Sequence, residues 1–221
     1  VDILKQSAQA RQNKYLGLVV DATGSRGPTW DRAQKILRSI LSRLSKASGL
    51  QMRVIYFGGN KVGDLGWNGD LLGVERRMAE VRCETGGTQI REGLAKFVDD
   101  SRGSLPENVI LIGDAFEEEI EGLKAVLKEY RRRNIRIFSF FEPGGYTEQA
   151  DAETVFRKIA KVTNGVFQEY REGVYLDELM VAVAAYAAQG KEGLERLVAE
   201  NSRAALTIQR ELLRIEGNTE G

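Results

Sequence analysis

Short, mostly apolar runs alternate with amphipathic stretches over the first 170 residues of the chain. The runs cover residues 15–20, 52–57, 109–112 and 136–141. Runs of this kind are typical of strands that are buried on both faces of a parallel sheet. Residues 165–170 are predicted to form a last strand. Residues 61–67, which follow a glycine turn, are predicted to form an antiparallel edge hairpin with 52–57.

Between the runs, apolar residues recur three and four positions apart, which is the period of an amphipathic helix. The predicted helices cover residues 31–45, 70–81, 89–98, 117–133 and 154–162. Thr29 is the expected N-cap of the first helix. Acids at 117–119 and arginines at 131–133 suit the dipole of the fourth helix. The alternation predicts an α/β fold with a doubly wound, mostly parallel sheet, helices on both faces and an antiparallel edge strand.

The pattern changes after residue 176, where helical stripes replace the alternation of strands and helices. We expect one helix that closes the sheet and a second from about residue 191 to 215. The predicted organisation is an N-terminal extension (1–13), an α/β domain (14–189) and a C-terminal helix with a frayed tail (190–221). The last helix either packs back on the domain, which is the favoured interpretation, or serves a constitutive partner or self-association.

Composition excludes several classes of function. The chain has 32 basic and 32 acidic residues, so its formal net charge of zero offers no electrostatic basis for nucleic-acid binding. It has no histidine, which excludes His-based nucleophilic triads and His-ligated zinc. Cys83 is the single cysteine, so no internal disulfide forms, and a cytoplasmic location is expected. No apolar stretch approaches the ~20 residues of a membrane span, and no signal peptide is recognised.

Oxygen-bearing side chains follow several of the predicted strands. Asp21, Thr23 and Ser25 alternate directly after the first strand, Thr88 follows a pair of glycines, and Asp114 follows the third buried strand. Ligands of open α/β sheets bind outside the carboxyl ends of the strands, so we expect one crevice to collect these side chains. Two carboxylates and three hydroxyls form a hard-oxygen set, which selects Mg²⁺, Mn²⁺ or Ca²⁺. The adjoining glycines, Gly24 and the Gly86-Gly87 pair, are expected to permit close backbone approach and positive φ.

These residues resemble the metal-ion-dependent adhesion site of the von Willebrand factor A (VWA) family. The family's pattern is Asp-x-Ser-x-Ser after the first strand, a Thr in a Gly-Gly-Thr-like loop, and an Asp after the fourth strand in sheet order. Here it appears as Asp21-Ala-Thr23-Gly-Ser25, Gly86-Gly87-Thr88 and Gly113-Asp114. The resemblance covers about residues 14–170.

Two positions depart from the family's pattern. Thr23 stands where Ser is usual, and it keeps the hydroxyl, so metal binding is expected to survive. Arg26 stands where an uncharged residue is common. A positive charge at this place either repels the cation or helps to hold an anionic ligand, and the sequence leaves both interpretations open.

The resemblance implies that Thr23, Ser25 and Thr88 contact the metal, with Asp21 and Asp114 binding it directly or through water. A cation held largely by neutral hydroxyls retains affinity for one more anion, which an Asp or Glu of a protein partner would supply. The implied function is that of an adaptor, a metal-dependent protein-interaction module. Recognition of this kind breaks no bond, so the chain is expected not to be an enzyme.

Two alternatives remain open. A Mg²⁺-dependent phosphatase or phosphoryl-transfer enzyme would need a nucleophile or phosphate cradle, yet Thr23 stands where an Asp-x-Asp motif has its second acid, and no phosphate-binding glycine loop is present. The other alternative is a degenerate, metal-free VWA scaffold, whose thermal stability would not change when Mg²⁺ is added. Each motif taken alone is also compatible with ordinary turn and cap chemistry, and the acids at 117–119 are interpreted as a helix start rather than as ligands.

Overall fold

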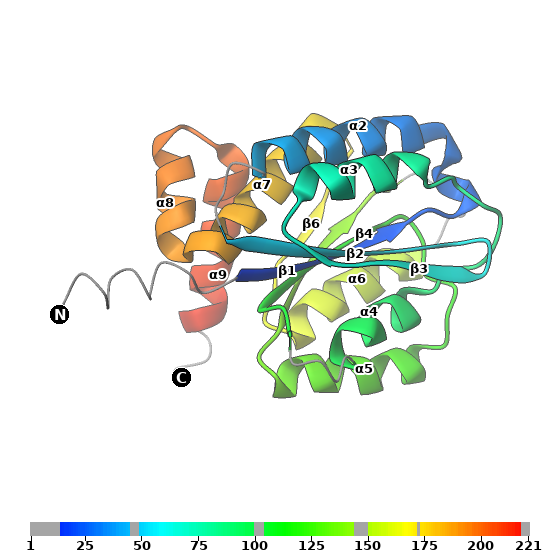
Figure 1. Ribbon diagram of the computed structural model, residues 1–221. Coiled ribbons are helices and arrows are strands. Elements are labelled where there is room, and N and C mark those ends of the chain that lie inside the picture. Colours follow the sequence, from blue (N-terminus) through cyan, green and yellow to red (C-terminus); the bar gives the residue numbers. More distant parts are fainter. Residues whose placement is uncertain (1–13, 45–48, 100–103, 144–149, 172, 218–221) are drawn as a thin grey trace.

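A six-stranded sheet with helices on both faces forms the centre of the molecule (Figure 1). The computed structural model describes residues 14–44, 49–99, 104–143, 150–171 and 173–217, so the predicted extension over 1–13 lies outside the described residues. The strands are β1 (Lys14–Asp21), β2 (Leu50–Gly58), β3 (Lys61–Asn68), β4 (Asn108–Gly113), β5 (Arg136–Phe141) and β6 (Phe167–Glu169). Their order in the sheet is β3-β2-β1-β4-β5-β6. Only the pairing of β2 with β3 is antiparallel among these strands. The predicted α/β architecture with an antiparallel edge is confirmed.

The helices divide between the two faces of the sheet. They are α2 (Gly27–Leu44), α3 (Leu71–Glu80), α4 (Ile90–Val98), α5 (Ile120–Arg132), α6 (Ala150–Val162), α7 (Gly173–Gln189), α8 (Lys191–Ala199) and α9 (Arg203–Gly217). One face is covered by α2, α3 and α7, and the other by α4, α5 and α6 (Figure 1). Successive side chains of β1 serve both cores, since Leu18 packs on the α2 side and Val19 on the α4 side. This double burial explains why the inner strands are mostly apolar.

Two details at the first helix differ from the prediction. A 3₁₀ turn, η1 (Gly24–Arg26), follows β1, and α2 continues from it at Gly27. Thr29 therefore lies inside α2 and is not its N-cap. None of the described helices has the length and apolar character that crossing a bilayer requires.

The predicted single C-terminal helix is two helices, α8 and α9. Asn201 adopts a left-handed conformation with φ of 66°. Its N–H donates to Val198 O, and the N–H of Ser202 donates to Leu197 O, each at 2.9 Å. This hydrogen-bond pattern terminates a helix, and an apolar stripe alone does not reveal it. Helix α9 then packs against α7 and α8, burying Ala204, Ala205, Ile208 and Leu212.

Ser202 is expected to stabilise the start of α9. Its Oγ accepts the backbone N–H of Ala205 at 3.2 Å, satisfying one donor of the first helical turn. Ser202→Ala should lower the free energy of unfolding by about 1 kcal/mol. Ser202→Asp should keep a free energy of unfolding close to that of the wild type, because a carboxylate caps equally well. Urea unfolding measures both variants, and equal losses would show that the hydroxyl does not act as a cap.

Candidate metal centre

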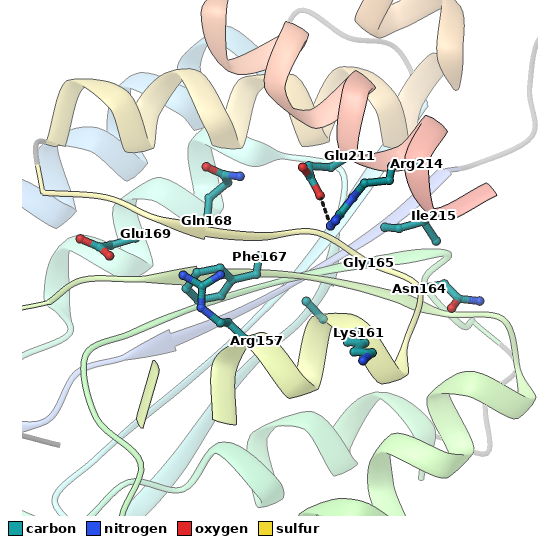
Figure 2. A pocket seen from close by; sticks show the side chains of 11 residues that line it. Arg157, Lys161, Asn164, Gly165, Phe167, Gln168, Glu169, Glu211, Arg214 and Ile215 are labelled. Carbon is teal, nitrogen blue, oxygen red and sulfur yellow. Dashed lines mark hydrogen bonds and ion pairs between the residues drawn. The ribbon is translucent and has the colours of Figure 1, made fainter. Parts of the chain in front are cut away.

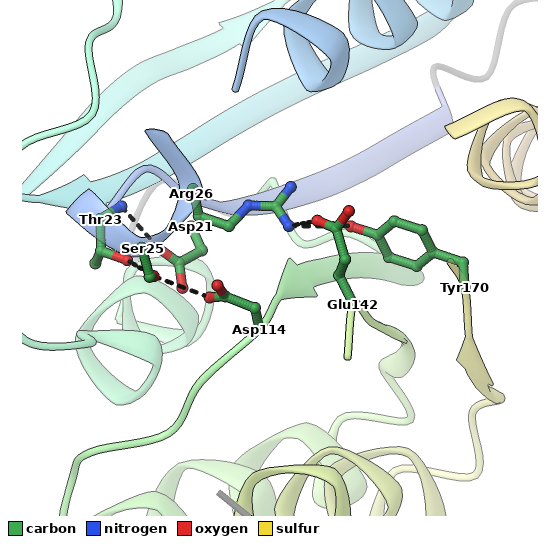
Figure 3. A network of polar contacts seen from close by, with 7 residues as sticks. All are labelled: Asp21, Thr23, Ser25, Arg26, Asp114, Glu142 and Tyr170. Carbon is green, nitrogen blue, oxygen red and sulfur yellow. Dashed lines mark hydrogen bonds and ion pairs between the residues drawn. The ribbon is translucent and has the colours of Figure 1, made fainter. Parts of the chain in front are cut away.

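The segment after β1 gathers three of the predicted side chains at the carboxyl edge of the sheet (Figure 3). Asp21, the last residue of β1, is fully buried. Its Oδ1 accepts the backbone N–H of Thr23 at 2.8 Å. The Oγ atoms of Thr23 and Ser25 lie in hydrogen-bond contact at 3.0 Å. The short turn η1 therefore brings these three side chains together.

Asp114 joins the same group from the neighbouring strand. Because β4 pairs in parallel with β1, both strands end at the same edge of the sheet. The hydroxyl of Ser25 donates to Asp114 Oδ1 at 3.3 Å. A Cβ at Gly113 would lie only 3.0 Å from the ring of Phe156, so glycine suits this crowded strand end. Asp21, Thr23, Ser25 and Asp114 thus form one hydrogen-bonded cluster, which we call the rim cluster.

None of the hydrogen bonds among the described residues joins the side chain of Thr88 to the rim cluster. Its Oγ1 accepts the backbone N–H of Glu117 at 2.8 Å, and its own N–H donates to Glu117 Oε2 at 3.1 Å. The loop that carries Thr88 also forms a parallel β-bridge between Glu84 and Thr23. Thr88 is therefore packed on the segment that follows β4, and its role as a metal ligand stays a prediction.

Glu118 caps α4, which precedes it in the chain, and Glu117 binds the loop just before that helix. Glu118 accepts the backbone N–H groups of Ile90 and Arg91, and Glu117 accepts that of Thr88. The prediction that the acids at 117–119 open the following helix holds only for Glu119, the N-cap residue of α5, and is wrong for Glu117 and Glu118. The first turn of α4 lies beside this loop and presents N–H groups that need acceptors. Burial raises the pKa of Glu118, and the hydrogen bonds from the α4 backbone oppose the rise.

The glycines of the Thr88 loop serve close packing. A Cβ on Gly86 would lie 2.6 Å from the backbone nitrogen of Asn60, in the turn between β2 and β3. Gly87 N–H donates to Asn60 Oδ1 at 3.2 Å. The predicted close approach is confirmed at Gly86. The predicted positive φ is wrong for Gly24, Gly86 and Gly87, which do not adopt it. In the facing turn, Gly59 and Asn60 have positive φ, at 60° and 58°.

The chemistry of the rim cluster fits a hard divalent cation. Asp21 Oδ2 is buried and has no hydrogen-bond partner among the described residues. Burial raises the pKa of Asp21 to about 7, with the negative charge of Asp114 adding to the rise and the Thr23 hydrogen bonds opposing it. A bound cation would give the buried Oδ2 a partner and would stabilise the ionised form of Asp21. The described residues contain no group of three acids or cysteines suited to a metal, so hydroxyl ligands would be required here.

The role of Arg26 was open from the sequence alone, and Glu142 and Tyr170 were not predicted to belong to the site. The structure buries Arg26, which is 1% exposed, and its guanidinium contacts the Glu142 carboxylate and the Tyr170 hydroxyl (Figure 3). Arg26 thus faces an internal carboxylate, which argues against a role in holding an external anionic ligand. One sequence signal was available: Glu142 directly follows β5, and Tyr170 directly follows β6.

An open pocket of about 760 Å³ lies elsewhere, beside β6 and between α6 and α9 (Figure 2). Its lining includes Arg157, Lys161 and Arg214 but none of the predicted metal residues. Arg157 pairs with Glu153 and Arg214 with Glu211, so these two positive charges are already matched by neighbours on their own helices. The rim cluster, with an unsatisfied buried carboxylate oxygen, is the more specific chemical feature.

Comparison with known proteins gives structural neighbours only. No protein-family model and no curated protein matches the sequence. A von Willebrand factor type A structure from Catenulispora acidiphila has 14% sequence identity to this chain and a TM-score of 0.63. The alignment covers 80% of this chain and 43% of the Catenulispora chain. Proximal thread matrix protein 1 from the mussel byssus aligns over 81% and 47%, at 16% identity and a TM-score of 0.63. This chain therefore spans less than half the length of either.

Two further structures extend the comparison. BatB from Bacteroides thetaiotaomicron aligns with 78% of this chain and 99% of its own, at 14% identity and a TM-score of 0.56. Another structure of the mussel protein is described as having a zinc-occupied MIDAS motif, and it matches at 17% identity over 79% of this chain and 46% of its own, with a TM-score of 0.59. Identities this low establish a shared fold and leave the function to be argued from the residues.

Proposed function

Since this chain has the fold of von Willebrand factor A domains, we propose that it is a divalent-metal-dependent protein-interaction module. The observation that carries the proposal is the rim cluster, in which Asp21 Oδ2 is buried without a hydrogen-bond partner among the described residues. Thr23, Ser25, Asp21 and Asp114 would hold Mg²⁺, Mn²⁺ or Ca²⁺, with Thr88 as a further ligand. The bound cation would supply an open coordination position for a partner's carboxylate.

The burial of the cluster supports recognition of an external acid. Asp21 is fully buried, whereas Ser25 is only half-buried and the neighbouring Gly24 is exposed. Ser25 is therefore the member of the rim cluster nearest to solvent, and Thr23 and the two carboxylates are buried behind it. Positive charge on the solvent side of such a site is incompletely neutralised, which favours an Asp or Glu of a protein partner over a neutral group.

The phosphatase alternative has weaker support among the described residues. Burial raises the pKa of Cys83 to about 11, so its thiol is protonated at neutral pH and is a poor nucleophile. Glu117 and Glu118, the acids that follow Asp114 most closely, accept backbone N–H groups just before and at the start of α4. These hydrogen bonds leave them poorly placed to act as a general base.

Thermal unfolding in EDTA, Mg²⁺ and Mn²⁺ tests the proposal. A cation that binds only the folded state stabilises it by about 3 kcal/mol at a hundred times its Kd. For a chain of this size, the unfolding temperature should then rise by about 6–12 °C. An unchanged unfolding temperature would favour the metal-free scaffold instead. Turnover of p-nitrophenyl phosphate in Mg²⁺ would favour the enzyme alternative, and we expect none.

A further inference from the structure

A buried ion pair lies directly beside the rim cluster. Arg26 follows Ser25 in the chain, and its guanidinium contacts the carboxylate of Glu142. It also donates to the hydroxyl of Tyr170 at 3.3 Å, and that hydroxyl donates to Glu142 at 3.3 Å. Figure 3 shows Arg26 reaching from the loop of the rim cluster to the two residues that follow β5 and β6.

The charge of Arg26 acts on two sides. It favours the ionised form of Asp21, and the negative charges of Asp21 and Asp114 in turn favour the charged guanidinium. On its other side, Glu142, whose side chain is 17% exposed, neutralises part of the same charge. Charges interact strongly here because Arg26 and Asp21 are both removed from water.

We propose that the Arg26–Glu142 pair sets the affinity of the rim cluster for divalent cations. Arg26 is a fixed counter-charge to Asp21 and Asp114, so an incoming cation must bind against its repulsion. Glu142 limits this repulsion by neutralising Arg26. The inference rests on the proposed function and goes beyond it, because it assigns the control of metal affinity to residues that are not themselves ligands.

A purely structural role of the pair makes a different prediction. If the contact only held the loop after β1 in place, removing either partner would loosen the loop. Cation binding would then weaken in both variants. The electrostatic role predicts changes of opposite sign, because Arg26→Gln removes a positive charge and Glu142→Gln removes a negative one. The two single variants therefore separate the two roles.

Isothermal titration of the full chain with Mn²⁺ provides the test. We expect Arg26→Gln to bind Mn²⁺ about tenfold more tightly and Glu142→Gln about tenfold more weakly. Arg26→Lys should remain close to the wild type, since it keeps the charge. Tyr170→Phe should also remain close, since it removes a hydrogen bond and no charge.

The outcomes distinguish the two proposals. Weaker binding in both Gln variants, or no change in either, would overturn the role of the pair while leaving the metal site intact. A wild-type chain that binds no Mn²⁺ would overturn the proposed function itself, and the inference with it. If Arg26→Gln does not fold, Glu142→Gln and Arg26→Lys decide together, because unchanged or tighter binding in Glu142→Gln contradicts the electrostatic role. Weaker binding in Glu142→Gln, with Arg26→Lys still like the wild type, supports it.

Discussion

Between pH 4 and pH 7, the metal-free protein is expected to lose about 3–4 kcal/mol of stability that the Asp21→Asn variant does not lose. Burial, reinforced by the charge of Asp114, raises the pKa of Asp21 from 3.8 to about 7. The folded protein therefore keeps a proton that the unfolded chain releases near pH 4. The stabilising contribution of Asp21 is complete below pH 4, declines as the pH rises, and is lost above pH 7.

Urea unfolding in EDTA at pH 4 to 9 measures this difference. Asparagine keeps the oxygen that accepts the N–H of Thr23, so the comparison isolates the charge. Above pH 7 without metal, Asp21→Asn should be the more stable protein, and Mg²⁺ should stabilise only the wild type, since metal binding requires the ionised carboxylate. Parallel stability curves for the two proteins would contradict the prediction.

Asp64 offers a control of opposite sign. Hydrogen bonds and ion pairing with Arg53 lower the pKa of Asp64, although partial burial opposes them. Its stabilising contribution is therefore present at neutral pH and is lost as the pH falls below the ordinary range of an aspartate. Asp64→Asn should be less stable than the wild type at pH 7 and approach it in acid.

Asp114→Ala is expected to abolish the stabilisation by Mg²⁺ or Mn²⁺, a loss of about 3 kcal/mol at a cation concentration of a hundred times the wild-type Kd. The substitution removes one of only two carboxylates in the rim cluster and the acceptor of the Ser25 hydroxyl. Thr88→Ala should reduce the same stabilisation if Thr88 is a ligand. It should also lower stability in EDTA, because Thr88 Oγ1 accepts the N–H of Glu117.

Glu118→Gln is the matched control for both substitutions. It alters an acid on the same segment as Asp114, but this side chain caps α4. We expect it to lower stability equally in EDTA and in Mg²⁺, so the metal-dependent rise in unfolding temperature should be retained. If Asp114→Ala keeps the full rise, the assignment of the rim cluster is wrong. If Glu118→Gln loses the rise, the site extends to the α4 cap.

The strands and most helices were predictable because their signal is local. In a doubly wound sheet, each inner strand is buried on both faces, so β1 and β4 are apolar throughout. The errors have two origins. At the start of α5 a neighbour in space matters, since Glu118 accepts N–H groups of α4. The break between α8 and α9 is local, but an apolar stripe does not reveal the left-handed Asn201.

The sequence by itself determined the α/β fold and the local part of the candidate site, since Asp21, Thr23 and Ser25 lie within one short turn. Tertiary structure decided the rest. Only the parallel pairing of β1 with β4 brings Asp114 to Ser25, and only the folded sheet joins Arg26 to Glu142, which is 116 positions away. The physical reason is that spacing along the chain governs contacts within a turn, whereas strand order, register and burial govern contacts between distant segments.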